Sequence, residues 1–316
     1  MRDRPAGLPD QDVIAGLRAG WGIQVREAGY LPLGAGSYHW SVVADDGQRW
    51  FVTIDDHGAD ADALDRALTT ALTLHDKAGL DFVVAPVETR GGRATWRLSP
   101  RYTASVFPLL DGVGGAFGPH RPQDRGAVVA MLATLHRATP AVDTVAARAD
   151  LDLPDRDELT RTLADLDVEW HSGPFAEPAR ALLKDSADRI EGWLADHDRL
   201  VAEVRTSTRP WVVTHGEPHP GNVVRTNSGL RLVDWDTARL APPERDLWLV
   251  TSDADLLARY TEATGLTVSP TAMDMFRLRW KLADIAAFVG DLRRPHGAGE
   301  DPAAALHYLT GYLRDR

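Results

Sequence analysis

The sequence predicts an α+β protein with a small, sheet-rich N-terminal lobe and a larger, mostly helical C-terminal lobe. Residues 21–110 consist largely of short β-rich runs separated by Gly-containing turns. From residue 111 onward apolar residues recur mostly at helical spacing, with one strand-like interruption at 211–236. We therefore expect two domains, which cover residues 1–110 and 111–316.

The first 110 residues read as helix, sheet, helix and sheet. Asp46-Gly47 lies between two β-rich runs and is a strong hairpin signal. Asp10 is a suitable cap for the first helix, which Gly20 ends. The expected elements are a helix at 10–20, strands within 21–34, 37–46 and 48–56, a helix at 60–77, and three further strands within 81–112 around the turn Arg90-Gly91-Gly92.

The C-terminal part reads as helices around one hairpin. The turn Asn227-Ser228-Gly229 joins the runs "NVVRT" and "LRLVDWD", which we expect to pair as strands. The expected helices lie at 122–138, 155–169, 176–204, 244–264, 270–292 and 301–314.

Composition narrows the class of protein. The net charge is −11, with 46 acidic against 35 basic residues, which argues against a nucleic-acid or membrane-surface partner. The chain contains no Cys, so disulfides and thiolate metal sites are excluded. The N-terminus leads into no apolar segment typical of a signal peptide, and no apolar run is long enough to span a membrane. We expect a cytoplasmic protein, either monomer or dimer.

The stretch "HGEPHPGN" carries the clearest chemical signal. Its spacing, His215, then Glu217, then Asn222, is that of the H-x-D-x-x-x-x-N loop of phosphoryl-transfer enzymes, with Glu in place of Asp. Asp234 follows twelve residues after Asn222, on the expected returning strand. A hairpin of this length brings an amide and a carboxylate together, and Mg²⁺ favours such oxygen ligands. His215 is expected to hydrogen-bond the loop backbone.

Two further segments are candidates for ligand contact. In "LGAGSYHW" the small residues Gly34, Ala35, Gly36 and Ser37 allow backbone N–H groups to approach phosphates, although a plain hairpin turn has the same composition. The segment "SVFPLLDG", with Phe107 and Leu109, is either a linker between lobes or a backbone contact for an adenine edge.

Three acidic residues are candidates for supporting the loop or for binding substrate. Asp246, in "PPERDLW", is expected to brace the loop that contains Glu217. Asp236 is a candidate for substrate binding. Asp284 either faces a cationic substrate or belongs to a solvated helix face.

Together these motifs resemble the aminoglycoside phosphotransferase family, whose bilobal protein-kinase-like fold is shared with choline and homoserine kinases. The segments that carry the resemblance are "HGEPHPGNVV", "LVDWDTARLAPPERDLW", "MLATLHRATP" and "RLRWKLADIA". It implies that ATP or GTP donates a phosphoryl group to a hydroxyl of a small molecule, with cationic antibiotics among the candidates. It also implies that Glu217 is the catalytic acid position, that Asn222 and Asp234 hold Mg²⁺, and that Gly34 to Ser37 cover the nucleotide.

The sequence departs from this family at two positions. Glu217 is one methylene longer than the family's Asp but is still a carboxylate. Thr53 stands where a Lys on the third strand binds the nucleotide phosphates, and the helix at 60–77 lacks the partner Glu. Arg49 or Arg101 could substitute. An active kinase and a pseudokinase that binds metabolites or partners therefore both stay open, whereas a glycosidase with Glu217 and Asp234 or Asp236 would leave the spacing to Asn222 unexplained.

Overall fold

The protein is described by a computed structural model. It describes residues 1–5, 7–34, 36–56 and 61–314. Two predicted features, Ala35 of the small-residue loop and the start of the helix expected at residue 60, therefore lie outside the described residues.

The chain forms two compact units, each built from two segments of sequence. Unit 1 comprises Met1–Ala149 and Arg209–Val268, and unit 2 comprises Asp150–Thr208 and Ser269–Arg316. These bounds group the N-terminal sheet with the predicted catalytic hairpin. The predicted division into functional domains at residue 110 stays a prediction, because the two compact units are divided at different residues.

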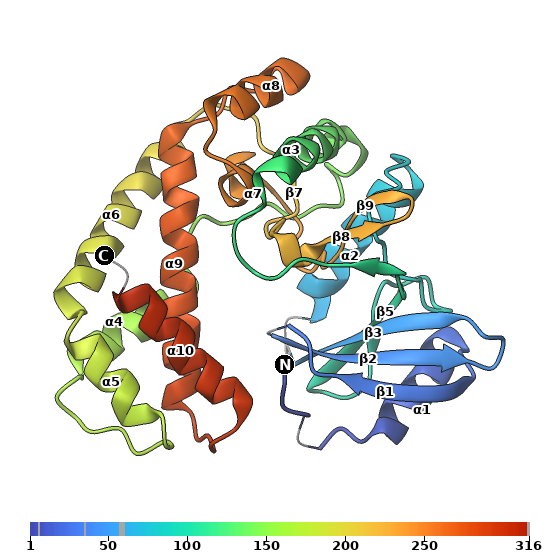
Figure 1. Cartoon of the computed structure of the whole chain (residues 1–316), viewed down its shortest axis with the longest axis horizontal. Coiled ribbons are helices and arrows are strands. Elements are labelled where there is room, and N and C mark those ends of the chain that lie inside the picture. The colour runs from blue at the N-terminus through green and yellow to red at the C-terminus, as the bar shows by residue number, and fades with distance from the viewer. Residues whose placement is uncertain (6, 35, 57–60, 315–316) are drawn as a thin grey trace. The chain divides into compact units, whose positions relative to one another are not determined.

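Unit 1 holds the sheets and five of the helices named in Figure 1. Its elements are α1 (Asp10–Trp21), β1 (Val25–Leu31), β2 (Ser37–Ala44), β3 (Arg49–Asp56), α2 (Ala61–Asp76), β4 (Trp96–Arg97), β5 (Tyr102–Pro108), β6 (Gly112–Val113), α3 (Pro122–Arg137), η1 (Thr139–Ala141), β7 (Val212–Thr214), η2 (Pro220–Asn222), β8 (Val223–Thr226), β9 (Gly229–Leu232), β10 (Arg239–Ala241), α7 (Glu244–Val250) and α8 (Ala254–Thr264).

An antiparallel sheet in the order β1-β2-β3-β5-β4 forms the N-terminal part of unit 1. The predicted hairpin at Asp46-Gly47 is confirmed: it joins β2 to β3, and Gly47 has a φ of 83°. Alternate residues of β2, β3 and β5 are hydrophobic and pack in one core with residues of α1, which lies along the sheet in Figure 1. This core includes Val13, Leu17, Trp40, Val42, Val52, Ile54, Ala104 and Val106. The intervening residues face the opposite side of the sheet.

The prediction of three strands within 81–112 is wrong in part. β5 and the two-residue β4 form, but residues 81–88 form no strand. This segment makes scattered backbone bonds instead: Val84 N–H donates to Leu232 and Val87 N–H donates to Val106. Pro86 between them has no N–H to donate, which interrupts any ladder.

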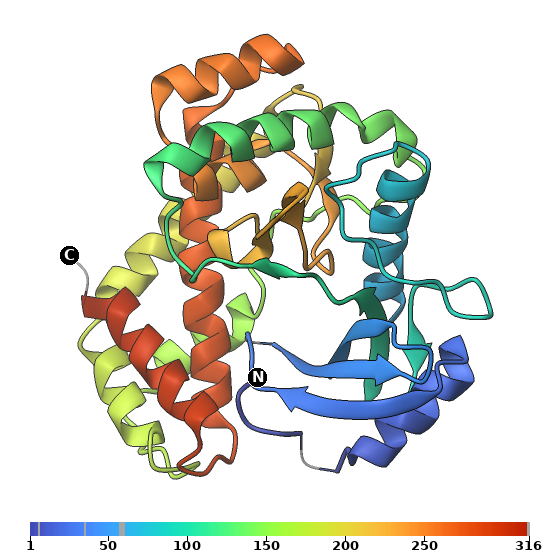
Figure 2. The same cartoon turned by 45° about the vertical axis from the view of Figure 1, so that its right-hand side comes forward.

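Two smaller sheets and the helices α2, α3, α7 and α8 complete unit 1. β7 pairs with β10, and β8 lies between β6 and β9. The predicted hairpin around residues 227–229 is confirmed as β8–β9, whereas β6 and β10 were not predicted. Helix α3 packs against α7 and α8, and Figure 2 shows α3 running beneath α8. The predicted helix 244–264 is split, because Asp253 caps a separate α8 by accepting the N–H groups of Asp255 and Leu256.

Unit 2 is a bundle of five helices. They are α4 (Arg156–Ala164), α5 (Ala176–Lys184), α6 (Ala187–Thr206), α9 (Pro270–Arg293) and α10 (Glu300–Arg314). The long helix α9 packs against the other four, and Figures 1 and 2 show it with α6 and α10 alongside. Its buried residues Leu282, Ile285 and Val289 lie in one continuous core. The predicted helix 176–204 is two helices, separated at residues 185–186.

Among the helices of the described chain, none is both long and apolar enough to cross a membrane.

Candidate active site

The predicted loop "HGEPHPGN" connects β7 to β8, and His215 at its start is completely buried. The imidazole Nε2 lies 2.8 Å from the carbonyl oxygen of Val233, and Nδ1 lies 3.1 Å from the backbone nitrogen of Glu217. Because a carbonyl only accepts and an N–H only donates, the neutral Nε2–H tautomer satisfies both contacts. Burial lowers the pKa of His215 to about 4, so this imidazole is neutral at physiological pH.

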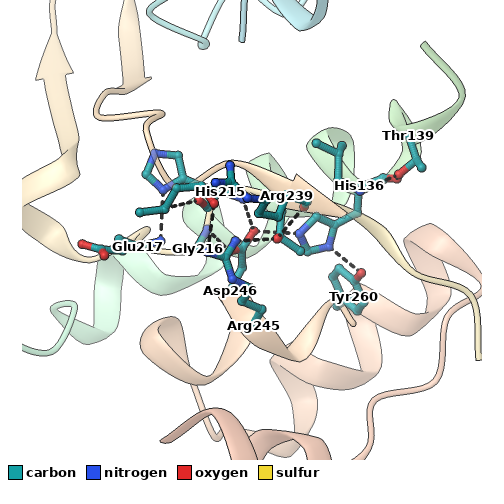
Figure 3. A network of polar contacts seen from close by, with 12 residues as sticks. His136, Thr139, His215, Gly216, Glu217, Arg239, Arg245, Asp246 and Tyr260 are labelled. Carbon is teal, nitrogen blue, oxygen red and sulfur yellow. Dashed lines mark hydrogen bonds and ion pairs between the residues drawn. The ribbon is translucent and has the colours of Figure 1, made fainter. Parts of the chain in front are cut away.

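Asp246, on α7, supports the start of the loop by accepting hydrogen bonds from its backbone. Its carboxylate accepts the backbone N–H of His215 at 2.9 Å and that of Gly216 at 2.6 Å. It also accepts from Nε2 of His136 at 3.0 Å, and Nδ1 of His136 lies 2.7 Å from the hydroxyl of Tyr260. Figure 3 shows the carboxylate between the loop backbone on one side and this pair on the other. The expected bracing role of Asp246 is therefore confirmed in its contacts.

The charge of Asp246 is retained in this buried network. Burial alone would raise the pKa of its carboxyl, but the hydrogen bond from His136 and the surrounding positive groups outweigh it and hold the pKa below its usual range. Two backbone N–H donors and one imidazole N–H all point at the same carboxylate. Such charge-assisted bonds are roughly twice as strong as neutral ones, so the loop start is held firmly.

Gly216 occupies a position that no other residue fills without strain. Its φ is 104°, and a Cβ built on it would overlap the guanidinium of Arg245. Arg245 in turn donates to the Thr214 hydroxyl and the Thr237 carbonyl, both at 2.9 Å. This arrangement fixes the backbone direction immediately before Glu217.

The second half of the loop is bonded from within and from outside. The Asn222 side-chain amide donates to the Glu217 carbonyl at 3.0 Å, which closes the loop on itself. His120, which precedes α3 and is buried, lies with Nε2 at 2.7 Å from the Pro218 carbonyl. His219 caps the η2 turn by accepting from Gly221 N–H. The Glu217 side chain is about one-third exposed, at 35%, and its Oε2 lies 4.0 Å from Nε2 of His219.

The structure brings Asn222 and Asp234 together. The Val233 N–H donates to the Asn222 carbonyl at 3.0 Å, and the Asn222 side chain favours the ionised form of the Asp234 carboxyl. Asp234 has a φ of 71°, in the left-handed region that Asp enters more readily than most residues.

Asp234 lies in a strongly negative environment. Burial and the charges of Asp236 and Asp55 raise its pKa well above the usual range. Repulsion from the two neighbouring carboxylates favours the protonated form of Asp234, because it removes one of three like charges. The contribution of Asp55 also shows that β3 and the hairpin approach each other within unit 1. Among the described residues, no group of three or more His, Asp and Glu side chains is arranged so that it could hold a metal ion.

A polar surface lies on the side of the N-terminal sheet opposite α1. Cross-strand pairing sets Ser37 opposite Asp55 and His39 opposite Thr53, and Thr53 also pairs with Ser105 on β5. The Ser37 hydroxyl donates to Asp55, and the Thr53 hydroxyl lies 3.4 Å from Nδ1 of His39. Thr53, at the position of the expected Lys, thus belongs to a hydrogen-bonded polar row.

The glycine loop and the connector segment border the same sheet. Gly34 and Gly36, between β1 and β2, are exposed with φ values of 66° and 89°. Phe107 of β5 pairs with Phe51 of β3. The N–H of Leu109 donates to the Arg49 carbonyl at 3.1 Å, so this amide is already engaged.

The two residues predicted to bind substrate, Asp236 and Asp284, lie in different units. Asp236 lies in unit 1 near Asp234, whose pKa it raises. Asp284 lies in unit 2, where it accepts from the Tyr312 hydroxyl at 2.6 Å. Burial raises the pKa of Asp284.

Four residues that support or border the loop were not predicted. His136 lies in the quoted segment "MLATLHRATP", but its role depends on Tyr260 and Asp246, which are distant in sequence. His120 has no motif around it, and Asp55 is simply the second residue after Thr53. The alternation of β3 was the one usable signal, because it sets Asp55 and Thr53 on the same face.

Comparison with known proteins identifies the class. A model of the phosphotransferase enzyme family matches residues 30–279, and the chain belongs to this family. The resemblance inferred from the motifs is confirmed, as is the α+β, protein-kinase-like fold. The family comprises small-molecule kinases.

Individual relatives extend this result. "Protein StrN" of Streptomyces griseus is 28% identical over 256 residues, which span 76% of this chain and 74% of that protein. A spectinomycin phosphotransferase solved with ADP and spectinomycin superposes with a TM-score of 0.76 at 17% identity, covering 97% of this chain and 94% of the other. An amicoumacin kinase solved with AMP-PNP, Ca²⁺ and its substrate gives a TM-score of 0.59 at 12% identity, covering 97% and 93%.

Proposed function

We propose that this protein is an active kinase that transfers the γ-phosphoryl group of ATP or GTP to a hydroxyl of a small molecule. The observation that carries the proposal is the fixed loop from His215 to Asn222 together with the Asn222–Asp234 pair. Phosphoryl transfer requires positioning and charge neutralisation more than covalent participation by the protein. A loop held by Asp246 supplies the first, and the hairpin residues supply ligands for the second.

Glu217 is the residue we assign to the acceptor hydroxyl. A new bond forms between the substrate oxygen and the γ-phosphorus while the bond from that phosphorus to the bridging oxygen breaks, and the nucleoside diphosphate leaves. The proton of the substrate hydroxyl passes to the Glu217 carboxylate. The partial exposure of this side chain supports access by substrate. Its backbone N–H and carbonyl are both bonded within the loop, which limits the movement that the longer side chain could cause.

Asn222 and Asp234 suit a magnesium ion bound with the nucleotide. Asp55 and Asp236 add negative charge around Asp234, and an accumulation of carboxylates is stabilised by a divalent cation. Mg²⁺ is commonly held by one or two protein ligands with the rest supplied by phosphate and water, so a complete protein cage is not needed. Bound there, it would neutralise charge on the phosphate oxygens.

The substrate class follows from the relatives and the acidic side chains. The relatives named above act on spectinomycin and amicoumacin, which makes a hydroxylated antibiotic or a similar metabolite our proposed substrate. We assign Asp236 to a cationic group of such a molecule, in keeping with the net charge of −11. The substrate-binding role expected for Asp284, in the other unit, stays a prediction from the sequence.

The second candidate function is a pseudokinase, and the specific observation in its favour is Thr53. A hydroxyl at this position carries no positive charge for the phosphates. Such a protein would bind a metabolite or partner without transfer.

A transfer assay separates the two. Purified protein is incubated with Mg²⁺, ATP or GTP and a panel of hydroxylated antibiotics and metabolites, and formation of phosphorylated product is followed by mass spectrometry. We expect product with at least one acceptor, and loss of that product in Asn222→Ala and in Asp234→Ala. Asp81→Ala is the matched control, because Asp81 is an exposed acid outside the loop and hairpin. Turnover that survives both substitutions would contradict the assignment.

A further inference from the structure

Thr53 of β3 stands where the family's lysine would bind the nucleotide phosphates, so another group has to make that contact. The three lysines of the chain, Lys77, Lys184 and Lys281, lie outside its strands. The two arginines considered as substitutes are engaged elsewhere. Arg49 donates to both carboxylate oxygens of Asp111 at 2.6 Å, about 13 Å along the strand from Thr53. Arg101 is paired in the same way with Asp56.

Arg101 is also on the wrong side of the sheet. Asp56, which it binds, is three residues from Thr53, and an odd separation along a strand sets side chains on opposite faces. Neither arginine therefore serves the polar surface that contains Thr53 without breaking an ion pair.

His39 of β2 lies directly opposite Thr53 and on the same face. Its Nδ1 lies 3.4 Å from the Thr53 hydroxyl, which donates to it when the imidazole is in the Nε2–H form. The other ring nitrogen lies beside the glycine loop: a Cβ built on Gly34 would be 3.5 Å from Nε2. The ring also stacks on Phe51, with centroids 4.9 Å apart, which limits its rotation.

The charges that face His39 come from two sources. Asp55, on β3, favours the protonated imidazole. The N-terminal ammonium of Met1, which donates to the carbonyls of Leu33 and Ser37, opposes it. Burial is the largest influence, and together these lower the pKa of His39 to about 4. In the free protein the imidazole is therefore neutral near pH 7.

We propose that His39 takes the place of the strand lysine and donates Nε2–H to a nucleotide phosphate beneath the glycine loop, becoming protonated as the nucleotide binds. The inference rests on the proposed function, because it requires that the protein bind a nucleoside triphosphate. A phosphate within hydrogen-bond distance stabilises the imidazolium and raises the pKa of His39 toward neutrality. Proton uptake and nucleotide binding are then linked, and affinity decreases as the pH rises.

Calorimetric titration with Mg²⁺ and ATP or GTP tests this coupling. Each titration is run between pH 5.5 and 8 in pairs of buffers with different ionisation enthalpies, so that the number of protons taken up is measured directly. His39→Gln keeps a hydrogen-bond donor but does not titrate, and His39→Ala removes the donor. His75→Gln is the matched control, because His75 is an exposed histidine on α2 that pairs with Asp76.

We expect wild type and His75→Gln to take up protons on binding, and His39→Gln to take up measurably fewer at the same pH. The titration of the nucleotide itself is common to all variants, so the difference isolates His39. We expect His39→Ala to bind about ten- to a hundredfold more weakly than wild type near pH 6, and the deficit to shrink as the pH rises. Circular dichroism melting curves establish that each variant is folded.

Two results would overturn the proposal. One would leave the proposed kinase function intact, and the other would overturn it as well. If wild type binds Mg²⁺–nucleotide but the His39 variants match it in affinity and proton uptake, the role of His39 is refuted and the proposed function stands. If wild type binds no nucleotide at millimolar concentration, both fall together.

Discussion

Asp246→Asn is the substitution that tests the support of the catalytic loop most sharply. The asparagine has the same shape as Asp246 but offers one acceptor oxygen and one NH₂ group. Its best orientation keeps the oxygen at the position that accepts from His215 and His136. The NH₂ group then faces the Gly216 N–H, where a 2.6 Å hydrogen bond existed.

The expected cost follows from these contacts. One hydrogen bond to a charged group is lost, which is worth about 1.5–3 kcal/mol, and the buried Gly216 N–H is left unsatisfied, which adds about 1–3 kcal/mol. The sum, roughly 2.5–6 kcal/mol, is a large share of the ~5–15 kcal/mol by which domains are stable. At roughly 2–4 °C per kcal/mol, we expect the melting temperature to fall by about 5–24 °C.

The dependence on pH gives a second signature of the same network. The folded pKa of Asp246 is below its usual range, so its stabilising contribution is present above the unfolded pKa, about 4, and is lost as the pH falls through the folded pKa. Thermal unfolding of wild type and Asp246→Asn, followed by circular dichroism, should therefore differ most near pH 7 and converge below about pH 4.

A matched control shows whether the charge or its position matters. Asp81→Asn removes one exposed carboxylate and should change the free energy of unfolding by less than about 0.5 kcal/mol. If Asp246→Asn melts within 2 °C of this control, in the same assay and at pH 7, the reasoning about the loop support is refuted.

Three further substitutions probe other parts of unit 1. Gly216→Ala should lower the free energy of unfolding by at least about 1–3 kcal/mol, because of its φ of 104° and its overlap with Arg245; unchanged denaturant midpoints would contradict this. His120→Ala should cost about 1–3 kcal/mol and reduce phosphoryl transfer, since the Pro218 carbonyl loses its partner, and His120→Gln should restore part of both. Asp253→Ala removes the cap of α8 and should cost ~1 kcal/mol in urea unfolding with turnover unchanged; a loss above 3 kcal/mol would be inconsistent with a capping role alone.

The fold could be predicted to the extent that its signals are local. Alternation and turn residues identified β1, β2 and β3 and the hairpin β8–β9, because both depend on residues close in sequence. The predictions that failed concern segments whose structure depends on tertiary contacts. Residues 81–88 have strand-like composition but bond to several separate segments, and two predicted helices are interrupted where their periodicity continues.

The candidate site shows the same division. Asn222 and Asp234 were expected together because one hairpin connects them, and Val233, next to Asp234, donates its N–H to the Asn222 carbonyl. His136 and Tyr260 reach the loop only through Asp246, by contacts between residues more than one hundred positions apart. Pattern within a segment carries no information about such contacts, so the residues that hold the loop were harder to predict than those that form it.

Magnesium-dependent nucleotide binding is the most direct test of the central claim, that the loop and hairpin form a working phosphotransferase site. Wild type and Asp234→Ala are titrated calorimetrically with ATP and with GTP, each with Mg²⁺ and with a chelator. The account predicts micromolar binding by wild type that requires Mg²⁺ and is lost in Asp234→Ala. No binding at millimolar nucleotide, or binding indifferent to both Mg²⁺ and Asp234, would contradict it.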